Sequence, residues 1–129
     1  MKALKLGASL AMAALLAWAS APALAQTQIK LEKVISGINT PLAMVQPAGD
    51  NRMFIIEQNG RIKILEGGKL LPNPFLDIRS KIKPLLQDFD ERGLLGLAFS
   101  PNFAADRTLY INLTNQAGNT EIRRYRMFT

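Results

Sequence analysis

The chain has 129 residues, of which 48% are hydrophobic, and a formal net charge of +6. It contains neither cysteine nor histidine. Disulfide bonds, thiolate chemistry and histidine as a general base are therefore excluded within these residues. The basic residues do not form the dense stripe with interleaved aromatic rings that is typical of nucleic-acid binding, so we expect no nucleic-acid partner.

Residues 1–25 have the pattern of a secretory signal peptide. Two lysines precede an apolar run over residues 6–19, and Ala23-Leu24-Ala25 fits the small-x-small cleavage pattern. The run is shorter than the ~20 residues that span a bilayer, which disfavours an uncleaved membrane anchor. We expect cleavage before Gln26, a secreted mature domain over residues 26–129 and no membrane attachment afterwards. The net charge then falls to +4, because the segment holds two lysines and no acidic residue.

The mature segment alternates short β-rich runs with turn residues. Polar and apolar residues alternate over residues 28–35, which predicts a strand with one buried face. Residues 42–45 form a short apolar run in front of a turn. Asn59-Gly60 lies between β-rich residues 53–57 and 61–65 and predicts a hairpin, because both residues tolerate the positive φ of a tight turn.

Turn-forming residues continue to separate short runs up to residue 89. Gly67-Gly68 predicts a second turn, and residues 75–78 follow as a strand after Pro72-Asn73-Pro74. Residues 80–89 have apolar positions at helical spacing, but Pro84 within them favours an irregular loop.

Residues 91–103 are the most specific stretch of the chain. Gly93 and Gly96 lack a Cβ and suit a bulge or a close approach of another group to the backbone. Residues 94–99 predict a strand buried on both faces, and Pro101 ends it because proline has no amide donor.

The last part of the chain returns to alternation. Residues 102–107 predict a polar loop, and residues 109–114 predict a strand with Leu109, Ile111 and Leu113 on one face. A turn around Gly118 precedes a last strand over residues 120–127. The chain then ends with no capping element, so we expect it to be part of a longer fold.

Taken in order, these elements resemble the opening segment of the glucose/sorbosone dehydrogenase family, soluble quinoproteins that oxidise aldose sugars with pyrroloquinoline quinone. The resemblance covers roughly Val34 to Arg126. It rests on five landmarks: Pro41-Leu42-Ala43, Glu57-Gln58-Asn59-Gly60-Arg61-Ile62, Phe75-Leu76-Asp77-Ile78, Gly93 to Pro101, and Arg123-Arg124-Tyr125.

The resemblance implies an all-β fold, the first one to two blades of a six-bladed β-propeller that is incomplete in this chain. About two blades fit residues 26–129, since a four-stranded blade takes ~40 to 45 residues. It also implies a periplasmic enzyme with an aldose substrate, and pyrroloquinoline quinone and calcium as cofactors of the full-length member. The family's catalytic histidine, in an Asp-His or Asn-His segment before paired glycines, has no match here. We therefore expect no catalytic residue in this chain and no cofactor bound by this segment alone.

Glu91 is the one residue to which the resemblance assigns a contact with substrate. In soluble glucose dehydrogenases a glutamine two residues ahead of the first glycine of the Gly-Leu-Leu-Gly element approaches the sugar. Glu91 holds that position, and a carboxylate there can accept hydrogen bonds from sugar hydroxyls but cannot donate them. The alternative is that Glu91 forms an ion pair with Arg92 or Arg61 at the blade rim.

The acidic residues Asp88, Asp90 and Glu91 also suggest a calcium loop. Aligned with an EF-hand, however, Arg92 would occupy position 5 and Phe99 position 12, where the ion needs oxygen ligands. A plain acidic loop without metal is therefore favoured. Nucleotide-binding and α/β-hydrolase motifs do not occur in the sequence.

Three hypotheses follow from the sequence. The chain is the amino-terminal part of a periplasmic quinoprotein sugar dehydrogenase, or of a related non-catalytic secreted propeller that binds sugar or protein. The third is a self-contained small β domain that merely shares these turns.

Overall fold

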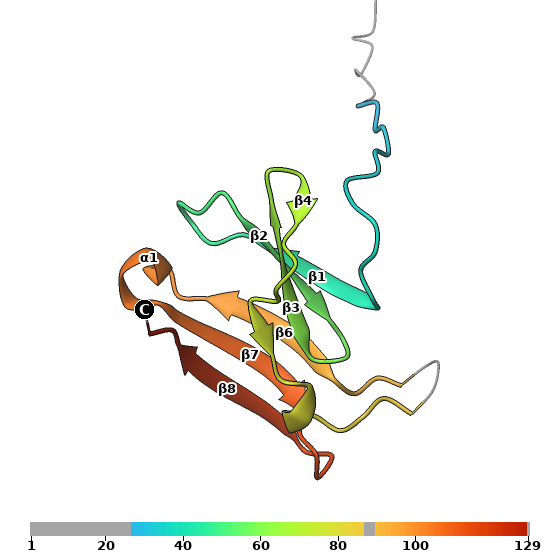
Figure 1. Ribbon diagram of the computed structural model, residues 1–129, viewed down its shortest axis with the longest axis vertical. Helices are drawn as coiled ribbons and strands as arrows, with labels where there is room; N and C mark the ends of the chain where they lie inside the picture. The colour runs from blue at the N-terminus through green and yellow to red at the C-terminus, as the bar shows by residue number, and fades with distance from the viewer. Residues whose placement is uncertain (1–26, 87–89, 129) are drawn as a thin grey trace, which may run out of the picture. The chain divides into compact units, whose positions relative to one another are not determined.

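The computed structural model describes residues 27–86 and 90–128 (Figure 1). The predicted signal peptide and Asp88 of the acidic loop lie outside these residues. The chain divides into two units, residues 1–31 and 32–129, and the second unit holds all the helices and strands that the structure describes. None of those helices is long and apolar enough to cross a membrane.

The first sheet is antiparallel and is built around a meander of three strands. These strands are β1 (Pro41–Val45), β2 (Met53–Glu57) and β3 (Arg61–Glu66), in that spatial order. Two short strands, β4 (Lys69–Leu70) and β5 (Leu76–Asp77), pair with the same edge of β3. β5 pairs with the beginning of β3 and β4 with its end.

The hairpin between β2 and β3 forms where the sequence predicts it. Glu57 pairs with Arg61, and Gln58, Asn59 and Gly60 make the turn. Gly60 has a φ of 103°, a conformation that side chains with a Cβ rarely adopt. The Asn-Gly signal therefore fixes the register of the first sheet.

The second sheet follows after a 3-10 turn, η1 (Arg79–Lys81), and the loop that leads to β6. It contains β6 (Leu94–Phe99), β7 (Thr108–Thr114) and β8 (Thr120–Arg126) in sequential antiparallel order (Figure 1). Leu109, Ile111 and Leu113 of β7 are at most 1% exposed, which confirms the predicted buried face of this strand.

One hydrophobic core joins the two sheets. Phe54 of β2 packs against Phe75 and Phe99, with ring centroids 4.7 Å apart in both pairs. Phe99 of β6 in turn contacts Phe103, at 4.5 Å. The fully or nearly buried core residues are Phe54, Ile56, Ile62, Ile64, Ile78, Ile82, Leu94, Phe103, Leu109, Ile111 and Leu113. Both sheets therefore contribute to one core.

The strand predicted over residues 28–35 is wrong. These residues have no regular secondary structure, and Leu31 is 95% exposed. Alternation gives a segment a strand-like pattern, but a strand also needs a hydrogen-bonding partner. The two described sheets do not include this segment.

The predicted loop at residues 102–107 contains a short helix, α1 (Phe103–Asp106). Phe103 is buried in the core, and Arg107 ends the helix with a φ of 54°. Burial of one aromatic ring outweighs the polar character of the segment. Two other predicted strands are shorter than expected, since β5 covers only Leu76–Asp77 and β8 ends at Arg126.

β6 forms as predicted, but it is not buried on both faces. Leu94 is fully buried, whereas Leu95 and Leu97 are half-buried and Ala98 is exposed. Only the side of β6 that faces the shared core is covered within the described residues. The register shift between Leu94 and Gly96 confirms the predicted bulge.

Candidate functional site

The candidate site is the segment of residues 90–93 that leads into β6, together with the β2–β3 turn. Gln58 of that turn donates from its side-chain Nε2 to the carbonyl oxygens of Asp90 and Arg92, the latter at 2.8 Å. Its own carbonyl oxygen accepts the amide hydrogen of Leu94 at 2.9 Å. The turn of the first sheet thus holds the entry to the second.

Asp90 and Arg92, on either side of Glu91, are joined by an ion pair and hydrogen bonds, called here the Asp90–Arg92 clamp. Asp90 Oδ1 accepts the Arg92 amide at 3.0 Å and Arg92 Nε at 2.7 Å, and Asp90 Oδ2 accepts Arg92 Nη2 at 2.5 Å. Hydrogen bonds from the Arg92 side chain and the Leu86 amide hold the pKa of Asp90 well below its usual range. The same pairing raises the pKa of Arg92. In its ionised form the pair therefore constrains the backbone at residues 90–92.

Asp-x-Arg pairs recur in this chain. Asp50 with Arg52 and Asp77 with Arg79 show the same geometry, in which the arginine amide and guanidinium both donate to the aspartate. Such a pair stabilises a tight local turn and leaves the middle residue outside the clamp. At residues 90–92 the middle residue is Glu91.

Glu91 itself is exposed. The alternative in which it pairs with Arg92 or Arg61 is wrong, because Arg92 is engaged with Asp90 and Arg61 Nε donates to Glu57 Oε2 at 2.7 Å. Its carboxylate is thus available on a fixed backbone. This fits a hydrogen-bond acceptor for a polar ligand.

Gly93, just before β6, lies against the β2–β3 turn. Its φ is 120°, and a Cβ placed on it would lie 2.2 Å from the carbonyl oxygen of Gln58. Real Cβ atoms do not come so close, so only glycine fits. The prediction of a close backbone approach at this glycine is confirmed.

Glu57 is a buried charged residue whose role could not be predicted from the sequence. Its side chain is nearly inaccessible, and it accepts hydrogen bonds from the Asn39 amide at 2.9 Å and from Arg61. Both carboxylate oxygens are therefore satisfied, as a buried charge requires. The one available signal was an acid that ends an apolar strand four residues before an arginine.

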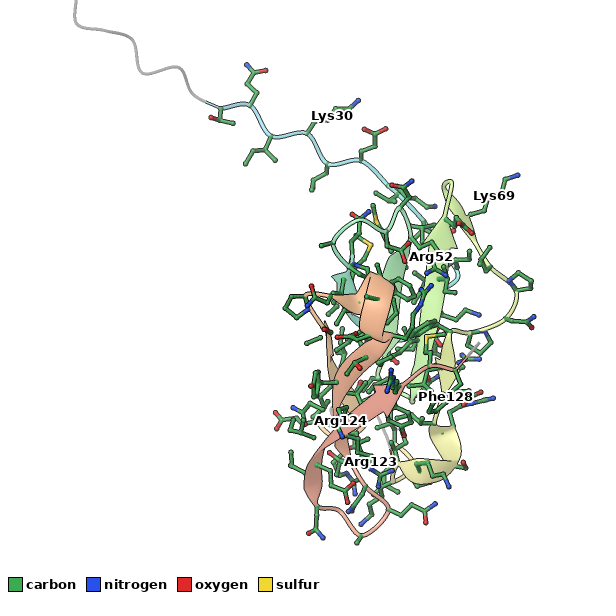
Figure 2. All side chains as sticks on the ribbon, turned by 90° about the vertical axis from the view of Figure 1, so that its left-hand side faces the viewer. Lys30, Arg52, Lys69, Arg123, Arg124 and Phe128 are labelled. Carbon is green, nitrogen blue, oxygen red and sulfur yellow. The ribbon has the colours of Figure 1, made fainter. Side chains whose placement is uncertain are left out.

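Hollows with cationic lining residues are where the described residues could meet a quinone, and a calcium ion would need clustered acidic side chains. Pyrroloquinoline quinone carries three carboxylates and calls for unengaged cations around a cavity. A polar hollow of about 310 Å³ has Lys81 and Arg123 among its lining residues, and Arg123 is paired with Glu121 at 2.6 Å. A second hollow, of about 510 Å³, has Arg107 and Arg126 among its lining residues. Figure 2 shows Arg123 and Arg124 on β8. Within residues 27–86 and 90–128, no three acidic side chains come together as a metal site would need.

Comparison with known proteins supports the resemblance seen in the sequence. The profile of the family described as Glucose / Sorbosone dehydrogenase matches residues 38–128. Hedgehog-interacting protein of Mus musculus is 40% identical over 86 residues, which are 65% of this chain and 12% of that protein. An uncharacterized protein of Synechocystis sp. is 32% identical over 106 residues, 77% of this chain and 25% of that one.

Solved structures of sugar dehydrogenases have the same fold. A crystal structure of a Thermus thermophilus protein assigned as an oxidoreductase (glucose dehydrogenase) matches with a TM-score of 0.61 and 27% identity. The matched region covers 76% of this chain and 28% of the Thermus thermophilus chain. The form of aldose sugar dehydrogenase from Streptomyces coelicolor with bound pyrroloquinoline quinone matches with a TM-score of 0.57 and 24% identity over 73% of this chain and 26% of that one.

Two successive antiparallel sheets with these neighbours define the chain as part of an all-β propeller of the soluble quinoprotein type. The chain belongs to the glucose/sorbosone dehydrogenase family. The likeness of these turns to the family is therefore not coincidental, as the third hypothesis assumed. The chain spans about an eighth to about a quarter of the length of the proteins and structures that it matches.

Proposed function

We propose that residues 26–129 form the amino-terminal part of a periplasmic quinoprotein that oxidises aldose sugars with pyrroloquinoline quinone, and that residues 1–25 are its cleaved signal peptide. The observation that carries this proposal is the family match over residues 38–128, together with the dehydrogenase fold of the neighbours. Calcium and the quinone are assigned to residues outside this chain.

In this proposal Glu91 contacts the sugar. The clamp between Asp90 and Arg92 fixes the backbone, and the exposed Glu91 carboxylate accepts hydrogen bonds from sugar hydroxyls. No catalytic residue is assigned within the chain. The sequence has no histidine to take the hydroxyl proton, so the general base is placed outside it.

The first test is the coding sequence on the far side of Thr129. A histidine that follows Asp or Asn and precedes paired glycines supports the dehydrogenase. The second test is dye reduction by the longer gene product with glucose or another aldose, added quinone and calcium. Glu91→Gln is expected to change KM more than kcat, because it alters binding rather than proton transfer. Glu66→Gln is the control, an exposed acid at the end of β3.

Purified residues 26–129 are expected to show no dye reduction under the same conditions, and to aggregate through unpaired strand edges. Activity of this segment alone would show that the chemistry has been placed in the wrong part of the protein.

The second candidate is a non-catalytic secreted propeller module that binds sugar or protein. It is favoured by the 40% identity with Hedgehog-interacting protein, which exceeds the 27% identity with the Thermus structure. A longer gene product that lacks dye reduction with every aldose but binds a sugar or a protein in calorimetry would support this candidate and exclude the first.

A further inference from the structure

Gln58 makes an unusual set of hydrogen bonds for a turn residue. Its Nε2 donates to the carbonyl oxygens of both residues that flank Glu91. An amide nitrogen carries two hydrogens, so one group can satisfy both carbonyls at once. The backbone on either side of Glu91 is therefore tied to a single side chain from the first sheet.

The main chain of Gln58 is anchored as well. Its amide donates to the Thr40 carbonyl at 3.0 Å, and its carbonyl oxygen accepts the Leu94 amide at 2.9 Å. Gly93 lies directly against that oxygen. The carboxamide thus projects from a fixed point, and the segment of residues 90–94 is held at both its side-chain and main-chain contacts.

The side chains of both neighbours of Glu91 are engaged with each other. The Asp90 side chain is only 8% exposed and is bonded to Arg92 and to the Leu86 amide. Within residues 90–92, Glu91 is the residue whose side chain remains exposed outside this clamp. The fixed backbone at Glu91 lowers the backbone part of the entropy cost of binding a ligand, while the exposed side chain keeps its rotamer freedom until a ligand binds.

We propose that Gln58 is a positioning residue for Glu91: its carboxamide fixes the backbone on both sides of this residue, so that the Glu91 side chain projects toward the sugar from a fixed main-chain position. The inference rests on the proposed function for its ligand, but the fixing of the segment can be measured independently. Gln58 acts through Glu91 and is not expected to touch the sugar.

The first readout is amide hydrogen exchange in the full chain. Gln58→Met keeps the side-chain volume and removes both donors, and Gln58→Asn keeps the donors but is one methylene too short. Either change is expected to speed exchange at the Arg92 amide about tenfold, as expected for the loss of one net hydrogen bond. Gln116→Met is the matched control, since Gln116 Nε2 donates to the Ser80 carbonyl at 2.7 Å, away from Glu91.

The second readout is a double-mutant cycle in the gene product that oxidises aldose, with glucose as the probe. Gln58→Met is expected to raise KM severalfold and to leave kcat within twofold. In a Glu91→Ala background the same change should add little, because its effect passes through the missing carboxylate.

The outcomes separate the inference from the proposed function. Faster exchange at Arg92 with a coupled KM effect supports a positioning role. Unchanged exchange in both Gln58 variants overturns it, and so do KM effects that simply add. If Glu91→Ala leaves the KM for glucose unchanged, the sugar contact is wrong, while exchange still decides whether Gln58 holds the segment.

Discussion

Gly93→Ala tests the close contact between the segment that leads into β6 and the β2–β3 turn. The added Cβ would lie 2.2 Å from the Gln58 carbonyl oxygen, and the residue would have to keep a φ of 120°. Such a conformation costs an L-residue about 1 to 3 kcal/mol. Pushing the Gln58 oxygen away would also break its hydrogen bond with the Leu94 amide, which leaves a buried group unsatisfied at a cost of about 1 to 3 kcal/mol.

Together these terms predict a loss of about 2 to 6 kcal/mol in the free energy of unfolding, a large part of the 5 to 15 kcal/mol typical of a native protein. The assay is urea unfolding of the gene product, followed by far-ultraviolet circular dichroism. Gly118→Ala is the matched control, because Gly118 has a φ of 90° but its nearest neighbour, Lys83 Nζ, is 3.9 Å from the added Cβ. The control variant has the strain of a positive φ but no steric clash between the added Cβ and a neighbouring atom. Equal losses in the two variants would refute the close approach at Gly93.

Three further predictions concern other parts of the chain. Leu94→Ala should lower the free energy of unfolding by about 2 to 5 kcal/mol, because Leu94 is fully buried. Leu95→Ala should lower it by about 1 kcal/mol, because Leu95 is half-buried. Similar losses for the two variants in urea unfolding would contradict this difference in burial. The pKa of Asp90 is lowered by Arg92, so its ion pair should persist below the ordinary aspartate pKa of about 3.9 and disappear only as the pH falls through the lowered value. A carboxyl carbon NMR titration with an ordinary midpoint would contradict the pairing. Cleavage of the signal peptide should remove Trp18, the only tryptophan, so tryptophan fluorescence of the mature protein would contradict it.

Local features of the fold could be predicted wherever a turn dipeptide or a regular alternation of polar and apolar residues was sufficient to specify them. Asn59-Gly60 gave the β2–β3 hairpin, and the alternation of residues 109–114 gave the buried face of β7. These signals are local because a positive φ and a period of two depend on neighbouring residues only. The family was also recognised from sequence, because its landmarks occur in a fixed order.

Predictions that depended on contacts with residues distant in the sequence were less successful. Residues 28–35 alternate like a strand but pair with neither described sheet, and residues 94–99 are apolar throughout but are covered on one side. Phe103 turned an expected loop into a short helix because its ring enters the core. In each case the decisive neighbour lies far along the chain, where periodicity carries no information.

The sequence by itself determined the strands and turns around the site, the family and the position of Glu91 two residues before Gly93. Only the tertiary structure decided how Glu91 is held. Gln58 lies more than thirty residues from its hydrogen-bond partners Asp90 and Arg92, and the choice of Asp90 rather than Glu91 as the partner of Arg92 depends on backbone geometry. The physical reason is that a hydrogen bond needs its donor and acceptor within about 3 Å, and the shared core of two sheets brings these residues that close.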